Sequence, residues 1–508
     1  MKASNRIIIN TLAQYIRTII NMVLSLYSSR LVLEILGIDD YGVYSLVAGV
    51  VSMLSFLTNS LAGSTQRFLS VSQGKGDIER LKEVFSNSLF LHVALGFVVA
   101  VILGILTPVI FDGFLNIPFD RVQVAKFLYI LVILMVYISF VAAPYRALLI
   151  SRENIVYTSI VDVIDGILKV VLVILLSYTA KDKLLAYGFI TLGIQLFNLL
   201  AYMIYSHLRY EECIFPKIKF FSWSYVKEIT SFTWWMLYSS VCVTTRTQGL
   251  AVVLNKIYGA AINAAYGIGS QISGMITFIS SSFNNAVAPQ LMAAEGGGDR
   301  RKMLALAEMQ SKISFLLLAM IGIPTMFEMQ KLLELWLVEV PQNTMLFGCV
   351  FLAMQIVDML STGLGAANKA IGNVGRYTIL TFTPKLFILP IAWFILKNEG
   401  SLVIVGIIMV IVEALCMLLR IYYLRKESWF NAGIYCKSVI LRSLPPVVAS
   451  VLVCGVLYIF VDGRFRFIYT YLSSIPIFLL TAYLITLTRS EKDIVRSILK
   501  KIFTRKYV

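Results

Sequence analysis

Long apolar runs follow one another along the whole chain, and each is separated from the next by a short polar segment. A helix needs about 20 mostly apolar residues to cross a bilayer, so the pattern predicts fourteen transmembrane helices. We expect the first run, which carries Arg17 in its middle and no small-residue cleavage site behind it, to be a retained span rather than a signal peptide. The predicted limits are 7–28, 42–64, 85–107, 123–144, 155–178, 185–207, 232–253, 264–286, 313–331, 345–366, 377–396, 402–424, 441–461 and 467–488.

The composition excludes a soluble enzyme. Of the 508 residues, 58% are hydrophobic and 14% are charged, whereas soluble globular proteins carry about 25% charged residues. We therefore expect an all-α polytopic membrane protein. Six cysteines and two histidines show neither the spacing of a metal site nor that of a disulfide framework, and no Ser, His and Asp set suggests catalysis. The sequence predicts no metal, no cofactor and no enzymatic activity.

The basic residues are distributed unevenly between the two sides of the predicted spans. Lys and Arg total 44 against 28 Asp and Glu, a net charge of +16. If both termini are cytoplasmic, about 29 basic residues fall in cytoplasmic segments and about 9 outside, which agrees with the positive-inside rule. The tail residues Lys500, Lys501, Arg505 and Lys506 could form a nucleic-acid patch, but beside a final span they are better explained as a topology anchor at anionic lipid. We expect no nucleic-acid partner.

The chain repeats itself at a nearly constant interval. Spans one to six match spans seven to twelve, and since six is even the two halves share one orientation and should enclose a cleft. The predicted organisation is an N-terminal lobe over 1–208, a cytoplasmic linker over 209–231, a C-terminal lobe over 232–425, and spans thirteen and fourteen with the basic tail over 426–508. The match rests on Gly37, Tyr44, Gly74, Gly76 and Asp77, which recur at one constant offset as Gly259, Tyr266, Gly296, Gly298 and Asp299, and on Ala147, Tyr157, Thr158 and Tyr202, which recur as Ala367, Tyr377, Thr378 and Tyr422.

Polar residues inside the spans follow helical spacing. In the first span Asn10, Gln14, Arg17 and Asn21 recur at steps of four, three and four, which places them on one face. A charge that faces lipid costs at least about 2.5 to 3.5 kcal/mol, so we expect these residues to line the cleft. The candidate substrate-binding residues are Arg17, Asn10, Gln14, Asn21, Lys169, Arg246, Lys385 and Gln355, and the candidate coupling or helix-bridging acids are Asp162, Asp165, Asp358 and Glu413.

Several of these residues have a second explanation. Asp165 and Lys169 are spaced to form an intrahelical ion pair, and Arg246 could reach an interface from near the end of its helix. Asp358 and Glu413 could bridge helices or bind a coupling H⁺ or Na⁺, and the sequence leaves both open. The segments GKGD and GGGD follow a membrane helix and lack the Lys-Ser/Thr ending of a phosphate-binding loop, so they are predicted to be turns.

Two sets of short motifs, one in each half of the chain, are typical of a known family. The first set is Leu36-Gly37, Asp40 to Tyr44, Arg67-Phe68 and Gly74 to Asp77, and the second is Asn263 to Gly267, Pro289-Gln290, Lys312 to Phe315, Ile323-Pro324 and Leu335 to Leu337. With these motifs the chain resembles the polysaccharide-flippase branch (Wzx-type repeat-unit flippases) of the multidrug/oligosaccharidyl-lipid/polysaccharide (MOP) exporter superfamily. The resemblance covers nearly the whole chain, but its motifs transfer no binding site.

The resemblance implies a MATE-like pair of lobes that translocates undecaprenyl-diphosphate-linked oligosaccharide across the bacterial inner membrane, with a polymerase and other assembly proteins as further partners. It implies a role in making a surface polysaccharide and does not distinguish O-antigen of lipopolysaccharide, capsule and exopolysaccharide. The alternative is a cation-coupled multidrug exporter of the same superfamily. Cationic drugs favour an acidic cleft, whereas the first span has Arg17 and no acid before Glu34. A scaffold of the assembly complex fits a charged, repeated interior poorly.

Overall fold

The structure, a computed structural model, describes residues 3–109, 111, 121–178, 182–215, 218–337, 340–427, 430–463, 465–488 and 491–492. All regular elements in these ranges are helices, which confirms the expected all-α polytopic membrane architecture. Their bounds are α1 (Ala3–Lys75), α2 (Ile78–Val109), α3 (Val122–Ser151), α4 (Ile155–Leu176), α5 (Lys183–Arg209), η3 (Ile218–Phe220), α6 (Trp223–Tyr258), α7 (Ala260–Gly296), α8 (Arg300–Phe327), α9 (Met329–Trp336), α10 (Thr344–Met359), α11 (Thr362–Ile371), α12 (Val374–Leu386), α13 (Ile388–Lys397), α14 (Leu402–Glu427), α15 (Ala432–Tyr435), η4 (Cys436–Leu441), α16 (Arg442–Phe460), α17 (Arg466–Thr481) and η5 (Ala482–Thr486).

All predicted spans fall on these helices, and some extend over two of them, such as 345–366 on α10 and α11 and 377–396 on α12 and α13. Within the described ranges, nine helical stretches are long and apolar enough to cross a membrane, and α10 with α11, bent by 49°, makes a tenth. The other predicted spans fall on the second half of α1 and on α4, α6 and α7. With 22, 36 and 37 residues, α4, α6 and α7 are long enough to cross at about 1.5 Å per residue, but they carry more polar or charged side chains.

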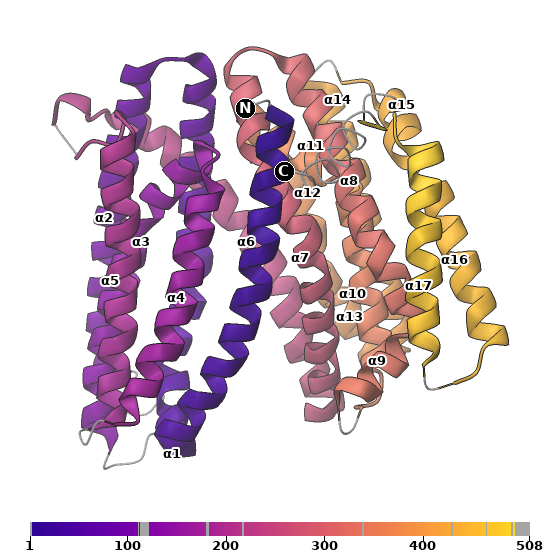
Figure 1. Cartoon of the computed structure of the whole chain (residues 1–508), viewed down its shortest axis with the longest axis horizontal. Coiled ribbons are helices and arrows are strands. Elements are labelled where there is room, and N and C mark those ends of the chain that lie inside the picture. Colours follow the sequence, from indigo (N-terminus) through magenta and orange to yellow (C-terminus); the bar gives the residue numbers. More distant parts are fainter. Residues whose placement is uncertain are drawn as a thin grey trace, which may run out of the picture. The chain divides into compact units, whose positions relative to one another are not determined.

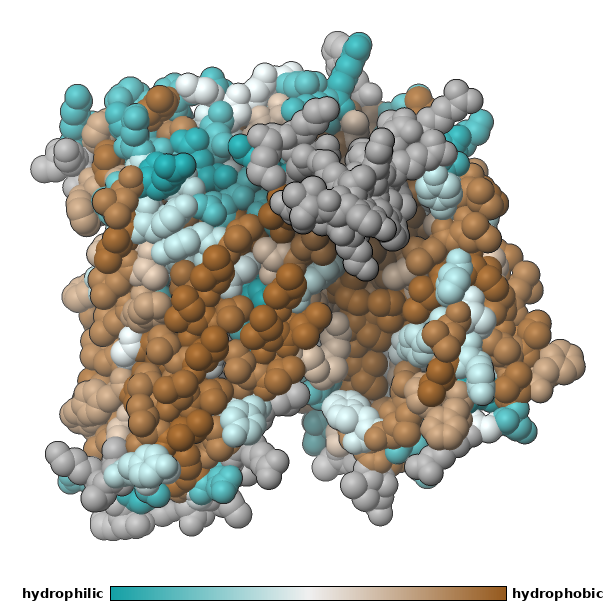
Figure 2. Space-filling view, viewed as in Figure 1, coloured by the Kyte–Doolittle hydropathy of each residue, from teal (hydrophilic) through white to brown (hydrophobic). Residues whose placement is uncertain are grey.

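The helices group into two compact units. One contains Asn5–Ser240 and Met292–Asp299, and the other contains Val241–Leu291 and Arg300–Val508. In the first unit α3 lies beside α2 and α5; in the second, α14 lies beside α10 and α12, and α16 beside α17 (Figure 1). Hydrophobic side chains cover most of the length of the helices, and hydrophilic ones gather toward their ends (Figure 2). The lobe limits at 208 and 232 stay a prediction from the sequence.

The backbone repeats at the interval found in the sequence. Gly37 interrupts α1 with φ +81°, and Gly259, its equivalent in the second half, separates α6 from α7 with φ +82°. Gly76 and Gly298, a second pair of equivalent positions, follow α1 and α7 with φ of +71° and +78°. Glycine adopts such angles without steric cost. The GKGD and GGGD segments are therefore turns, as predicted.

The ends of α1 and α7 cross within the first unit, immediately before these turns. A Cβ atom on Gly74 would lie 1.9 Å from the carbonyl oxygen of Ala293, and one on Gly296 would lie 2.0 Å from that of Val71. The two contacts are equivalent in the repeat, so the crossing is symmetric. Since no side chain can approach a backbone oxygen so closely, the crossing requires glycine at both positions.

Segments predicted to be cytoplasmic gather at one end of the first unit. The side-chain amide of Asn10 donates to the carbonyl oxygen of Glu153 at 2.9 Å, which joins the start of α1 to the turn between α3 and α4. Arg152 in that turn pairs with Glu212, beyond the end of α5, at 2.5 Å. The start of α1 and the segments after α3 and α5 therefore lie together, as an alternation of spans requires.

At the opposite end of α3, a single arginine joins the segments predicted to lie outside. Arg121, which precedes α3, pairs with Asp40 at 2.9 Å and with Asp182 at 2.8 Å. Asp182 also caps α5 by accepting hydrogen bonds from its first backbone N–H groups, a common device at helix N-termini. One cation and two acids therefore join α1, the start of α3 and the start of α5 at this end.

The last helices are attached to α8 at its middle and at its C-terminal end. Midway along α8, Lys312 pairs with Glu491 at 2.6 Å. Directly after the helix, the buried Glu328 accepts hydrogen bonds from Arg466 and Thr470, each at 2.9 Å. Apolar side chains of α8, α16 and α17 fill the space between these pairs. The predicted basic tail, with Lys500, Lys501, Arg505 and Lys506, lies outside the described residues.

Candidate functional site

A group of charged side chains from four helices meets in the first unit. Asp162 of α4 accepts hydrogen bonds at one carboxylate oxygen from Arg17 of α1 (2.7 Å) and Arg146 of α3 (3.0 Å). The hydroxyl of Tyr202 on α5 donates to its other oxygen at 2.9 Å. We call these four residues the Asp162 cluster. Two guanidinium groups share one carboxylate, so the cluster carries one excess positive charge.

The predicted intrahelical pair lies one turn further along α4. Lys169 and Asp165 are 2.7 Å apart, which confirms that they form an ion pair. The amide of Asn198 on α5 also donates to Asp165 at 2.6 Å. Asp165 therefore bridges α4 to α5, in addition to holding the lysine of its own helix.

The amides of the α1 stripe point toward neighbouring helices. Asn10 and Gln14 are buried, and Asn10 is used in holding the turn after α3. Asn21 lies against Gly166 of α4, where an added Cβ would meet its side-chain oxygen at 3.1 Å. That oxygen is buried and has no hydrogen-bond partner among the described residues. The stripe thus faces α4, with Arg17 as its charged member.

A second group of charges lies in the second unit. Glu413 of α14 pairs with Arg246 of α6 at 2.9 Å and with Lys385 of α12 at 2.7 Å. We call these three residues the Glu413 cluster. Their side chains are only 3% to 7% exposed, in contrast to 19% for Asp162 and 45% for Arg146. An acid therefore holds Arg246 within the second unit. The alternative explanation, in which this arginine reaches a membrane interface, describes a different arrangement.

Asp358, the other predicted acid of this unit, pairs with Arg420 of α14 at 2.8 Å. Arg420 also donates to the hydroxyl of Ser361 at 3.1 Å, in the break between α10 and α11. Gln355, one turn before Asp358 on α10, is half-buried. Asp358 therefore links the broken span to α14, and it forms a bridge between helices, as Glu413 does.

Both clusters are built on equivalent helices of the repeat. The Asp162 cluster uses the first, fifth and sixth helices, α1, α4 and α5, together with α3. The Glu413 cluster uses α6, α12 and α14, which are the first, fifth and sixth helices of the second half. The acid lies on the fifth helix in one half and on the sixth in the other. Each cluster combines two cations with one acid.

Three members of these groups are absent from the residues selected by sequence. Arg146 falls between the predicted spans 123–144 and 155–178, but α3 continues to Ser151, so the arginine is part of the helix. Arg420 lies two turns after Glu413 within an apolar run, and that spacing was a usable signal. Tyr202 is recognisable from the sequence only as a repeat position, because a tyrosine in a span has no charge to reveal its partner.

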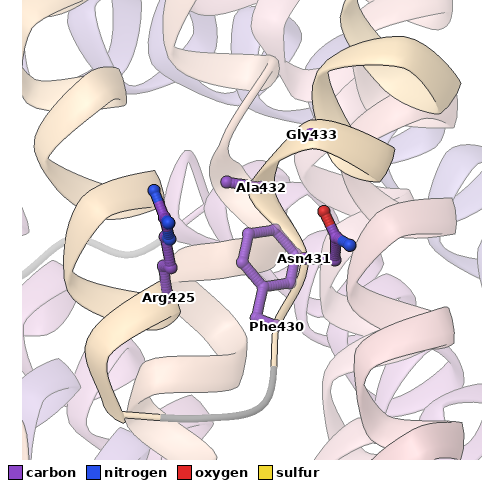
Figure 3. A pocket seen from close by; sticks show the side chains of 5 residues that line it. All are labelled: Arg425, Phe430, Asn431, Ala432 and Gly433. Atoms are coloured by element: carbon purple, nitrogen blue, oxygen red, sulfur yellow. The ribbon is translucent and has the colours of Figure 1, made fainter.

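A cavity of about 390 Å³ lies apart from these clusters, between the end of α14 and the start of α15 (Figure 3). The side-chain oxygen of Asn431 accepts a hydrogen bond from the backbone N–H of Ile434 at 3.1 Å and so caps α15. The cavity is thus at a helix junction, away from the candidate residues. It is lined by Arg425, Phe430, Asn431, Ala432 and Gly433.

The sequence places the chain in a family. Residues 4–294, more than half of the chain, match the model of a family described as polysaccharide biosynthesis protein. The chain belongs to the polysaccharide biosynthesis protein family. It is also similar to the uncharacterized membrane protein EpsK of Bacillus subtilis (strain 168), with 22% identity over 320 residues, and the match spans 61% of each protein.

Solved structures of MATE proteins share the fold of this family member. A MATE protein in a bent conformation superimposes with a TM-score of 0.72 at 16% identity, over 87% of this chain and 99% of the other. A MOP superfamily transporter from Pyrococcus furiosus, described as having a binding pocket of reversed polarity, gives 0.69 at 15% identity, over 84% and 96%. At such low identity the likeness shows the MATE fold, which the resemblance of the sequence implied.

Proposed function

We propose that this protein is a flippase that carries lipid-linked oligosaccharide repeat units, attached through a diphosphate to undecaprenol, across the bacterial inner membrane. The observation that carries the proposal is the Asp162 cluster, with its excess positive charge and partly exposed arginines. Asp162 lies seven residues into α4, about 10 Å along the helix axis. Membership of a polysaccharide biosynthesis family supports the same substrate class.

The charge of the clusters fits an anionic head group. Arginine donates pairs of parallel hydrogen bonds to phosphate oxygens, and an anion within a span requires compensating positive charge. Amides such as Asn21 and Gln355, which are half-buried, can bond sugar hydroxyls, while the lipid tail stays in the bilayer. A cationic drug would meet the excess positive charge of these clusters, which disfavours the multidrug exporter as the alternative function.

The acids of both units serve as helix bridges in this proposal. Asp162, Asp165, Asp358 and Glu413 each lie within 2.9 Å of a lysine or arginine. A carboxylate held so closely by a protein cation is poorly disposed to bind a coupling Na⁺ or H⁺. We therefore expect transport by the purified protein in vesicles to continue when Na⁺ is replaced by K⁺.

The orientation is part of the proposal. We place both termini, the turn after α1 and the segment after α5 in the cytoplasm, because the basic loops lie on that side. The substrate would then be loaded from the cytoplasmic leaflet and released on the other. A polymerase and other polysaccharide assembly proteins would receive the product there.

The function can be tested in the bacterium that carries the gene. Deletion should abolish surface display of one polysaccharide and leave lipid-linked repeat units in the inner leaflet, and a plasmid copy should restore display. Polysaccharide immunoblots and the lipid-linked pool are the measurements. Unchanged polysaccharide together with greater sensitivity to cationic drugs would favour the exporter instead.

A further inference from the structure

The Asp162 carboxylate occupies the position that a substrate phosphate needs. Arg17 and Arg146 both direct a guanidinium nitrogen at the same oxygen, Oδ2, at 2.7 and 3.0 Å. Two arginines that converge on one carboxylate oxygen can bind a phosphate oxygen in the same way. The acid therefore occupies the donors on which the proposed function depends.

The charge balance of the cluster changes with the position of this acid. With Asp162 between the arginines, the cluster has one excess positive charge; with Asp162 withdrawn, the arginines present two. A diphosphate diester carries one negative charge on each phosphate, so it matches the state without the acid. The substrate and Asp162 are thus alternative anions for the same two guanidinium groups.

Tyr202 offers Asp162 a second partner. Its hydroxyl donates to Oδ1 at 2.9 Å, the oxygen that the arginines do not use. A carboxylate displaced from the arginines can keep this hydrogen bond, so it is not left without a donor in a weakly polar environment. The side chains of Arg146 and Asp162 are 45% and 19% exposed, so part of each can be reached from outside the cluster.

We propose that Asp162 is an internal counter-anion, which holds Arg17 and Arg146 in the empty carrier and is displaced by the substrate diphosphate. This inference rests on the proposed function. A counter-anion explains how the carrier without substrate avoids two uncompensated cations, one on α1 and one on α3. Such a state is strongly unfavourable. The acid also weakens substrate binding, which allows the substrate to leave. Asp162 acts through the arginines and is a positioning residue.

The test measures binding of farnesyl diphosphate to the purified full-length protein by titration calorimetry. This soluble prenyl diphosphate is a monoester, so it carries at least the two negative charges of the substrate head group. Asp162→Asn removes the competing charge and should bind the probe at least tenfold more tightly, about 1.4 kcal/mol. In vesicles the same variant should flip lipid-linked substrate more slowly, because release becomes harder. The matched control is Glu212→Gln, which removes a buried acid from Arg152 and should leave affinity unchanged.

Equal or weaker binding by folded Asp162→Asn would show that the acid only orients the arginines, and the proposal would be wrong. If Asp162→Asn does not fold, Tyr202→Phe decides. It keeps every charge but removes a hydrogen bond that is stronger after displacement, when no guanidinium group shares the charge of the carboxylate, so binding should weaken about three- to tenfold. Unchanged binding by Tyr202→Phe would also overturn the proposal. Absence of binding by the wild type as well as both variants would instead contradict the proposed function itself.

Discussion

The buried Glu413 cluster makes a quantitative prediction. Glu413→Gln leaves Arg246 and Lys385 without their shared carboxylate, although both side chains are at most 7% exposed. Removing one partner of a buried ion pair costs about 3–5 kcal/mol, since the remaining charge stays desolvated. Lys385 keeps its electrostatic attraction to Asp358, whereas Arg246 loses its acid, so we expect the free energy of unfolding to fall by about the lower value, 3 kcal/mol.

Reversible unfolding of the purified protein in bicelles measures this loss. Glu334→Gln is the control, because Glu334 is 47% exposed and lies 3.8 Å from Lys331, and such surface pairs contribute about 0–1 kcal/mol. Adding Lys385→Met to Glu413→Gln removes one of the stranded cations and should recover part of the stability. The recovery separates a charge effect from a packing effect.

The result that would refute this reasoning is a Glu413→Gln protein as stable as Glu334→Gln. It would mean that water or another group compensates the two cations, and that the acid does not hold α6, α12 and α14 together. Equal stability of the single and double variants would show that Lys385 is not the group left uncompensated.

Three further predictions concern the rest of the molecule. Gly74→Ala should prevent accumulation of folded protein, since the added Cβ would lie 1.9 Å from a backbone oxygen. The control Gly104→Ala, whose Cβ would meet nothing within 4 Å, should accumulate normally, and fluorescence-detected gel filtration compares the two variants. Burial raises the pKa of Glu491 but the hydrogen bond from Lys312 and its other partners lower it more, so the pKa lies below its ordinary 4.5. The stabilisation is therefore present above pH 4.5 and is lost as the pH falls below it, and the melting-temperature difference between wild type and Lys312→Met should be constant from about pH 7 to 5 and shrink under 4.5. A cysteine near Asn398 should react with an impermeant thiol reagent in intact cells, and one in the turn after α1 should not; the reverse pattern would invert the orientation.

Much of the fold could be read from the sequence because each span must satisfy its own backbone hydrogen bonds. That requirement makes a run of about 20 apolar residues a helix wherever it packs. The repeat could also be recognised from the sequence. The backbone has positive φ angles at Gly37 and Gly76 and at their equivalents Gly259 and Gly298, and such angles favour glycine at all four positions. The pair Asp165 and Lys169 follows from helical spacing alone.

The partners across helices could not be read in this way. Asp162 and Arg17 are 145 residues apart, and nothing local indicates which acid meets which cation. Arg17 and Lys385 have no acid on their own helices within reach, which made them candidates for an open cleft, but packing supplies Asp162 and Glu413. The end of α3 was predicted too early because Pro144 and Arg146 interrupt the apolar run without interrupting the helix.

The central claim is that the Asp162 cluster serves the passage of an anionic, lipid-linked oligosaccharide. The most direct measurement is flipping of a fluorescent undecaprenyl-diphosphate oligosaccharide by the purified protein in vesicles, with wild type and Arg17→Gln compared at equal amounts of folded protein. Arg17→Gln leaves Asp162 paired with Arg146, so folding should survive. The account predicts flipping by the wild type and a loss of at least tenfold in the variant, as expected when a hydrogen bond to a charged group is removed. Equal flipping by folded wild type and Arg17→Gln would contradict it.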